Sequence, residues 1–307
     1  MFSTFKNKFF TLLIVALVIS ISGCSLPGLG GSSSDTIKIG ALGTSESTTM
    51  AYIIKQLIEH ETDYNADIIG NMGSSIVQHQ AQIQQEVDIT STRYTGTDLP
   101  GTLKMDPVTD PAKALTIVQE EFDKQFEQKW FDPYGFANSY AFTVTSELAE
   151  KENLEKVSDV EPLAADLSLG VDNAWLNREG DGYNGFIETY GFEFGKAYPM
   201  QIGLVYKAVE SGNMDVVLAY TTDGRIKSYD LVTLEDDKNF FPPYDASPVA
   251  NKEVLERFPE LEGLLDRLAG TIDNDKMIEM NYEADVGMVE PAVVAKKFLE
   301  ENNYFKD

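Results

Sequence analysis

The sequence predicts an α/β fold, and three observations support it. From residue 36 onwards, short apolar segments typical of strands alternate with segments of helical periodicity. Apolar residues make up 43% of the chain, which is enough for packed cores over about 270 residues. Two irregular stretches, 129–138 and 239–247, interrupt the alternation, as expected where a chain crosses twice between two lobes.

Repeated strand–helix alternation favours mostly parallel sheets with helices on both faces. The expected strands are 36–42, 66–70, 88–94, 139–145, 167–171, 214–220 and 230–235. The expected helices are 47–61, 74–86, 110–126, 201–211, 251–268 and 290–300. Asp110 is expected to cap one of these helices, with Pro111 at its first position, and Asn251 is expected to cap another.

The N-terminus has the pattern of a bacterial lipoprotein signal peptide. Lys6 and Lys8 precede an apolar run over residues 9–19, which is shorter than the about 20 residues that cross a membrane. Small residues then precede Cys24, the only cysteine of the chain. We expect residues 1–23 to be removed, Cys24 to be lipidated, and residues 24–35 to form a flexible tether. The alternative is a lone buried cysteine near an uncleaved anchor.

The charge and the residue counts exclude several functions. Removal of residues 1–23 takes away two lysines and no acid, so the formal net charge goes from −26 to −28. So acidic a chain repels nucleic acid and anionic lipid headgroups, and membrane attachment then has to come from the lipid. With two histidines, His60 and His79, and one cysteine, no disulfide, metal site or cofactor is expected.

No motif in the chain indicates catalysis. Residues 180–185 have the spacing of a dinucleotide-binding loop, but they follow no apolar strand and we interpret them as a turn. The sequence lacks a Gly-x-Ser-x-Gly, Cys–His or carboxylate-dyad signature, so we predict a protein that is not an enzyme.

Several tyrosines stand at the ends of expected strands or in the irregular stretches. They are Tyr94, Tyr140, Tyr220 and Tyr244. In open α/β sheets, ligands bind beyond the carboxyl ends of strands, so these positions can converge on one cleft. The alternative is that they are ordinary tyrosines of a lobe interface or a cleft rim.

A set of motifs spread along the chain carries a family resemblance. The motifs are residues 37–41, 93–97, 134–136, 140–142, 169–173, 198–206, 219–220, 223–227 and 241–244. With them the chain resembles the substrate-binding lipoproteins of osmoprotectant ABC importers, which take up glycine betaine, choline, carnitine and related quaternary ammonium solutes. The resemblance covers essentially the whole chain after Cys24.

The resemblance implies a two-lobed periplasmic-binding-protein-like fold of type II, with the ligand cleft between the lobes. Residues 36–136 and 240–307 would form lobe 1, and the inserted residues 137–239 would form lobe 2. It also implies a tyrosine cage around the methylated ammonium group. Tyr94 and Tyr244 would come from lobe 1, Tyr140 and Tyr220 from lobe 2, with the Thr97 hydroxyl and a backbone carbonyl near Asn138 beside them.

The implied function is a monomeric solute receptor, lipid-anchored at the extracytoplasmic face of the cell membrane, that delivers quaternary ammonium solutes to an ABC permease. Related sequences often carry a glutamine after the first strand motif, and here Leu42 stands at that position. Thr97 is neutral, which favours a broad ligand range because a carboxylate there would repel the acid end of betaine or carnitine. The alternatives are a receptor for another small cation or amino acid, a surface-anchored hydrolase, and a structural or adhesive lipoprotein.

Overall fold

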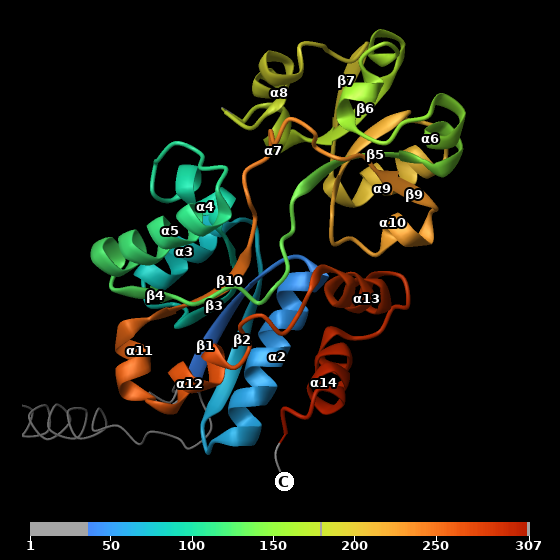
Figure 1. Cartoon of the computed structure of the whole chain (residues 1–307). Coiled ribbons are helices and arrows are strands. Elements are labelled where there is room, and N and C mark those ends of the chain that lie inside the picture. Colours follow the sequence, from blue (N-terminus) through green and yellow to red (C-terminus); the bar gives the residue numbers. More distant parts are fainter. Residues whose placement is uncertain (1–35, 179, 306–307) are drawn as a thin grey trace, which may run out of the picture. The chain divides into compact units, whose positions relative to one another are not determined.

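The computed structural model describes residues 36–178 and 180–305, so the predicted signal peptide, Cys24 and the tether lie outside the described residues. Within that part of the chain, the strands form two five-stranded sheets (Figure 1). The first sheet contains β1 (Thr36–Leu42), β2 (Asn65–Met72), β3 (Ile89–Tyr94), β4 (Gln128–Trp130) and β10 (Ala246–Asn251). The second contains β5 (Tyr140–Thr145), β6 (Ser168–Asp172), β7 (Lys196–Met200), β8 (Val216–Tyr220) and β9 (Leu231–Thr233).

The two sheets have equivalent strand orders, β2-β1-β3-β10-β4 and β7-β6-β8-β5-β9. The prediction of mostly parallel sheets is wrong. Over residues 36–178 and 180–305, each sheet has two parallel and two antiparallel pairings. The antiparallel pairings involve β10 and β5. These strands follow directly from the irregular stretches, with no helix between to turn the chain into a parallel direction.

The two irregular stretches run antiparallel to each other. Ala137 and Asp245 form an isolated bridge, and the N–H of Asn138 donates to the carbonyl of Tyr244 at 3.2 Å. The bounds of both stretches differ from the prediction, because β4 occupies residues 128–130, β9 ends at Thr233 and β10 begins at Ala246. This pairing places the two passages of the chain between the sheets side by side.

The predicted lobe boundaries follow the same passages. Strands β1 to β4 and β10 belong to the first sheet, and β5 to β9 belong to the second. We therefore propose residues 36–136 and 240–307 as one lobe and residues 137–239 as the other.

Helix α2 (Ser45–Glu61) is the main cover of the first sheet. Its buried side chains include Met50, Ile53, Ile54 and Leu57, which recur at the spacing of one helix face. It packs against β1, β2 and β3 and lies beside α14 (Figure 1). The other helices are α3 (Ser75–Ile83), α4 (Thr95–Gly101), α5 (Pro111–Phe126), α6 (Ser146–Glu152), η1 (Val157–Val160), η2 (Ala164–Asp166), α7 (Asn173–Leu176), α8 (Tyr183–Tyr190), α9 (Ile202–Glu210), α10 (Arg225–Ser228), α11 (Lys252–Arg257), α12 (Glu260–Asp266), α13 (Asn274–Asp285) and α14 (Pro291–Glu301).

Two predicted helix starts have different outcomes. The cap at Asp110 is confirmed, because its carboxylate accepts the N–H of Lys113 at 2.8 Å. The single helix predicted for 251–268 is wrong, since α11 and α12 are separate helices interrupted at Phe258 and Pro259. A proline disfavours the helical conformation of the residue before it, and Phe258 has φ −129° and ψ 79°. Asn251 precedes α11 but makes no side-chain cap hydrogen bond.

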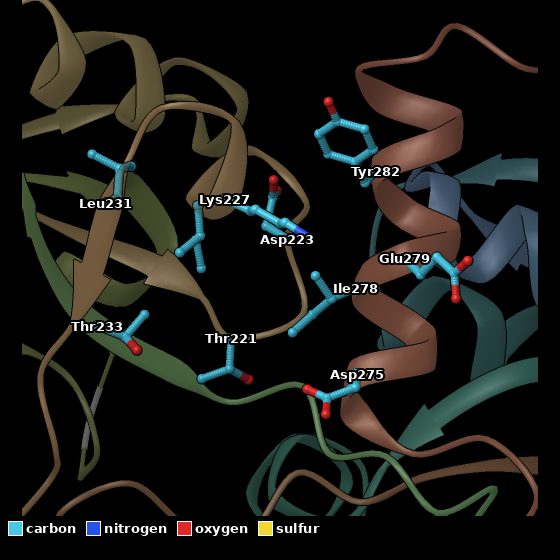
Figure 2. Close-up of a pocket in the computed structure, with 10 residues that line it drawn as sticks. Thr221, Asp223, Lys227, Leu231, Thr233, Asp275, Ile278, Glu279 and Tyr282 are labelled. Atoms are coloured by element: carbon cyan, nitrogen blue, oxygen red, sulfur yellow. The ribbon is translucent and has the colours of Figure 1, made fainter.

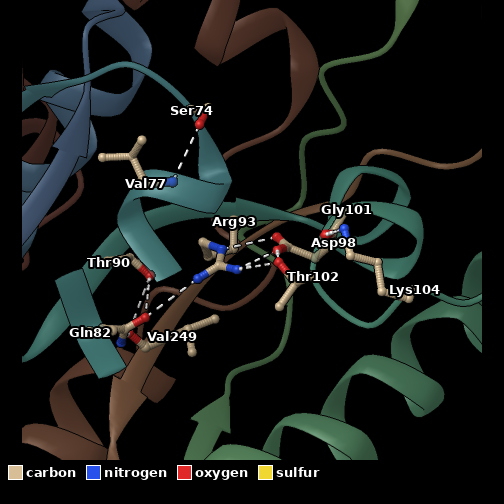
Figure 3. A network of polar contacts seen from close by, with 10 residues as sticks. All are labelled: Ser74, Val77, Gln82, Thr90, Arg93, Asp98, Gly101, Thr102, Lys104 and Val249. Atoms are coloured by element: carbon tan, nitrogen blue, oxygen red, sulfur yellow. Dashed lines mark hydrogen bonds and ion pairs between the residues drawn. The ribbon is translucent and has the colours of Figure 1, made fainter. Parts of the chain in front are cut away.

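A buried ion pair fixes the segment that follows β3. Arg93 and Asp98 are both fully buried, and the guanidinium Nε donates to the carboxylate at 2.9 Å, with a second contact from Nη2. Figure 3 shows Asp98 and Thr102 on one side of the guanidinium and Gln82 on the other. Gln82 in turn donates to the carbonyl of Val249 at 2.9 Å. The network thus joins β3 to α3, α4 and β10.

Replacement of Arg93 by methionine is expected to lower the free energy of unfolding by about 3–5 kcal/mol, because it leaves Asp98 buried without its partner. Chemical denaturation measures the change. The double variant Arg93→Met/Asp98→Leu should recover part of the loss, since it removes the orphaned charge. Lys124→Met, which removes an exposed ion pair in α5, should change stability by less than about 0.5 kcal/mol. Equal losses in the Arg93 and Lys124 single variants would contradict the prediction.

Candidate ligand-binding site

One cavity of about 500 Å³ brings together residues from the ends of strands in both sheets. Every residue that the sequence analysis named for ligand binding lines it: Tyr94, Thr97, Asn138, Tyr140, Tyr220 and Tyr244. Leu42, the residue that stands where related sequences often carry glutamine, also lines this cavity.

Tyr140 and Tyr220 form a cross-strand pair in the second sheet. Tyr140 is the first residue of β5 and Tyr220 the last of β8, and the antiparallel register places them opposite each other. Side chains opposite each other on adjacent strands project from the same face. Their ring centroids are 5.2 Å apart, so the two strands present a ready-made aromatic corner at the cavity.

Tyr244 adds a third ring at a steep angle. Its ring centroid lies 5.9 Å from that of Tyr140, with an interplanar angle of 83°. The hydroxyl donates to Asp181 at 2.5 Å, which ties the residue to the loop before α8. Three walls that face different directions can therefore surround a small group.

Tyr94 ends β3 and lines the cavity from the first sheet. Its hydroxyl donates to the carboxylate of Glu46 at 2.6 Å. Burial raises the pKa of Tyr94, Tyr140 and Tyr244 well above the ordinary value of a phenol, so these rings are neutral at physiological pH. Neutral phenol rings keep the electron-rich faces that attract cations.

Gly96 allows the segment of Tyr244 to approach the start of α4. A Cβ atom at Gly96 would stand 2.6 Å from the carbonyl oxygen of Pro243 and 3.2 Å from the Tyr244 ring. Thr95 fastens the same contact, because its hydroxyl donates to the Pro243 carbonyl at 2.8 Å. Close packing against Pro243 and Tyr244 therefore explains why residue 96 is a glycine.

Arg178 lines the same cavity and was missed by the sequence analysis. Its guanidinium donates to the Tyr140 hydroxyl at 3.0 Å and to the Tyr244 hydroxyl at 3.3 Å, and it pairs with Asp181 at 3.1 Å. The guanidinium carbon lies 5.2 Å from the centre of the Tyr140 ring. The signal was available in the sequence, because Arg178 is a cation beside the glycine-rich stretch 180–185. Residues 180–182 of that stretch form a bend, and α8 begins at Tyr183.

Asp172 is a second polar residue that the sequence analysis did not select. It ends β6, and its Oδ1 accepts the N–H of Trp175 at 2.9 Å. Its Oδ2 is buried and has no hydrogen-bond partner among the described residues, although Asp172 lines the cavity. A carboxylate and a guanidinium therefore stand at one aromatic cavity, which suits a small molecule that carries both charges.

A second cavity, of about 630 Å³, has a different lining. Figure 2 shows Ile278, Glu279 and Tyr282 of α13 on one side and Thr221 and Lys227 on the other. It contains a single aromatic residue among its lining residues, so it offers no box of rings. The predicted site residues all lie at the first cavity.

Over residues 36–178 and 180–305, no cluster of three histidine, cysteine or acidic residues could hold a metal ion. Within the same residues, no helix has the length and apolar character needed to cross a bilayer.

The comparisons with known proteins show the family of the chain. Residues 35–301 match the family model described as the substrate binding domain of ABC-type glycine betaine transport system. The chain belongs to this family. The family is one of transport substrate-binding proteins rather than of enzymes.

Several relatives match nearly the whole chain. The "Carnitine transport binding protein OpuCC" of Listeria monocytogenes is 52% identical over 304 residues, which cover 98% of this chain and 99% of that protein. The "Glycine-betaine-binding protein" of Pseudomonas aeruginosa is 30% identical, over 96% of each chain. A solved structure described as a "glycine betaine/carnitine/choline ABC transporter" is 51% identical and superposes with a TM-score of 0.80, over 88% of this chain and 100% of that one. The predicted two-lobed fold is thereby confirmed.

Replacement of Gly96 by alanine is expected to displace the Tyr244 segment, because the new methyl group would overlap the Pro243 carbonyl. The free energy of unfolding should fall by about 1–3 kcal/mol. Gly101→Ala, in the same helix, is the matched control, since nothing lies within 4 Å of a Cβ atom there. Thermal denaturation of both variants checks the prediction, and equal melting temperatures would contradict it.

Proposed function

We propose that this protein is a receptor for quaternary ammonium solutes, among them glycine betaine, carnitine and choline, and that it delivers them to an ABC permease. The trimethylammonium group would sit among Tyr94, Tyr140, Tyr220 and Tyr244. The observation that carries the proposal is the convergence of these four neutral rings on one cavity of about 500 Å³.

The chemistry of the ligand explains why rings are needed. A quaternary ammonium group has no N–H, so neither a hydrogen bond nor a close salt bridge can select it. Aromatic faces attract the charge through their quadrupoles, and each contributes roughly 0.5–2 kcal/mol. Four faces supply several kcal/mol of the about 8 kcal/mol that micromolar binding requires.

Arg178 is the group that we propose for the acid end of betaine or carnitine. Among the lining residues of the described chain it is the one with a permanent positive charge. A guanidinium binds a carboxylate through two parallel hydrogen bonds. The hydroxyl of Thr97 would stand beside it as a neutral donor, and Leu42 contributes an apolar surface where a polar group was expected.

The N-terminal sequence and the family support a proposal for the cellular setting. We propose a monomer, lipidated at Cys24, that resides at the extracytoplasmic face of the cell membrane. A receptor for another small cationic solute is the second candidate. A Helicobacter pylori protein named for ergothioneine transport is 33% identical over 84% of this chain, and the chain spans 46% of that protein's length.

Calorimetric titration with choline, glycine betaine and carnitine tests the proposed function. All three are expected to bind, and Tyr220→Leu should weaken each at least about 10-fold, because it removes one aromatic face. Tyr220→Phe keeps the face and should stay within about 3-fold of the native protein. Trp175 is buried with its ring centroid 6.4 Å from that of Tyr140, so its fluorescence gives an independent signal of occupancy. Binding of choline alone, or of none of the three, would contradict the proposal.

Arg178→Met should separate the ligands by their charge. The affinities for betaine and carnitine are expected to fall at least about 10-fold, whereas the affinity for choline, which lacks a carboxylate, should change little. The ratio of the betaine and choline dissociation constants measures the effect. An equal loss for all three ligands would show that Arg178 acts only by holding Tyr140 and Tyr244 in place.

A further inference from the structure

A buried carboxylate without an ion-pair partner lies directly behind the tyrosine cavity. Glu46 belongs to the first turn of α2 and is 4% exposed. Among residues 36–178 and 180–305, no lysine, arginine or histidine forms an ion pair with it. A buried charge without such a partner is costly, so its environment has to stabilise it in another way.

Four side-chain groups surround the two oxygens of Glu46. The hydroxyl of Tyr94 and the amide Nδ2 of Asn138 reach Oε1 at 2.6 Å and 3.0 Å. The hydroxyl of Thr222 and the amide Nδ2 of Asn281 reach Oε2 at 2.6 Å and 3.2 Å. An amide nitrogen can only donate, and both hydroxyls are able to donate. The arrangement therefore fits an ionised carboxylate, which accepts hydrogen bonds at both oxygens.

The two partners of Oε1 are also residues of the ligand cavity. Tyr94 and Asn138 both line it, and each is held by the same carboxylate oxygen. Because Nδ2 of Asn138 donates to Glu46, its Oδ1 is the remaining polar atom of that amide, and it has no hydrogen-bond partner among the described residues. Glu46 thus fixes which atom of the amide is free. It also polarises the phenol of Tyr94 towards more negative charge on the ring.

We propose that Glu46 is a buried counter-charge for the bound cation, acting through Tyr94 and Asn138. This inference rests on the proposed function, because it names how the same cavity favours a positive ligand. The charge would act through a few ångströms of protein rather than through water, where the surface charges of the chain are screened.

The proposal has a consequence for pH. Burial raises the pKa of Glu46, although hydrogen bonds from Thr222 and Tyr94 oppose the increase. A cation in the cage favours the ionised carboxylate, so the pKa should be lower in the complex than in the free protein. The part of the cation affinity that Glu46 contributes is then fully present above the pKa of the free protein, and it is lost as the pH falls through that pKa towards the lower pKa of the complex. Binding at a pH near that value should release a proton.

Other ionisable groups face Glu46 from the surrounding elements. They are Tyr94 of β3, Tyr220 of β8, Asp223 after β8, Arg225 of α10 and Asp285 of α13. The tyrosines are neutral in the relevant range, and Asp223 is bound by Arg225 at 2.5 Å. Burial raises the pKa of Asp285, which accepts a hydrogen bond from Ser45, so Asp285→Asn is needed as a control.

The test compares two ligands of equal shape and different charge. Choline and its uncharged carbon analogue, 3,3-dimethyl-1-butanol, are titrated into the native protein, Glu46→Gln and Asp285→Asn between pH 5 and pH 8. Glu46→Gln is expected to weaken choline about 10-fold at pH 8 and to change the affinity of the analogue by less than about 2-fold. The native affinity for choline should fall with pH, and this dependence should be absent in Glu46→Gln and retained in Asp285→Asn.

Each outcome of this test supports or overturns the role proposed for Glu46. A preferential loss of choline binding, with the pH dependence removed, supports the proposal. Equal losses for both ligands, or no loss for either, overturn it and leave Glu46 a structural residue. If Glu46→Gln does not fold, the native protein alone suffices, because a pH dependence shared by choline and the analogue overturns the proposal. Failure of the native protein to bind choline at all overturns the proposed function instead.

Discussion

The pairing of the two crossover segments is the constraint on which the site depends. Asn138 and Tyr244 are joined through their backbones, and from there the chain enters β5 in one direction and β10 in the other. Each sheet thereby receives an antiparallel strand beside its third parallel strand. Tyr94 and Tyr220 are the last residues of their strands, and they lie at the end of each sheet where the crossover segments enter it. A cavity with rings from both sheets is a result of this topology.

The electrostatics of the cavity differ from those of the molecule as a whole. The chain has a formal net charge of −26, which favours cations near its surface but discriminates little between them. Inside the cavity, neutral phenol rings are combined with one guanidinium and with carboxylates held behind or beside them. The contacts of Arg178 with Tyr140, Tyr244 and Asp181 hold its guanidinium at the cavity. The groups at the cavity therefore select the ligand by its charge, whereas the net charge of the chain only raises the rate at which cations encounter it.

Local sequence signals predicted a large part of the fold, whereas the set of site residues was named with the help of the family resemblance. The short apolar runs before Tyr94 and Tyr220 were enough to predict that these residues end strands. Asp110 with Pro111 predicts a helix start because the cap forms through local hydrogen bonds. The missed features depend on contacts distant in sequence. Strand β10 pairs with β3 and β4 from far along the chain, and it was not predicted: the expected irregular stretch covered only its first two residues. Arg178 and Glu46 resembled ordinary surface charges until the fold placed them around Tyr94 and Tyr140.

The register between β5 and β8 determines how much of the ligand cavity is formed before a ligand binds. Tyr140 and Tyr220 are neighbours on adjoining strands of one sheet, and their spacing is maintained by the backbone ladder between them. These two rings therefore do not need to rearrange when a small molecule binds. On the opposite side, Tyr94 is held by Glu46 and Tyr244 by Asp181, so these rings lose little freedom on binding either. An aromatic cavity whose walls are fixed beforehand spends little of its binding energy on ordering side chains.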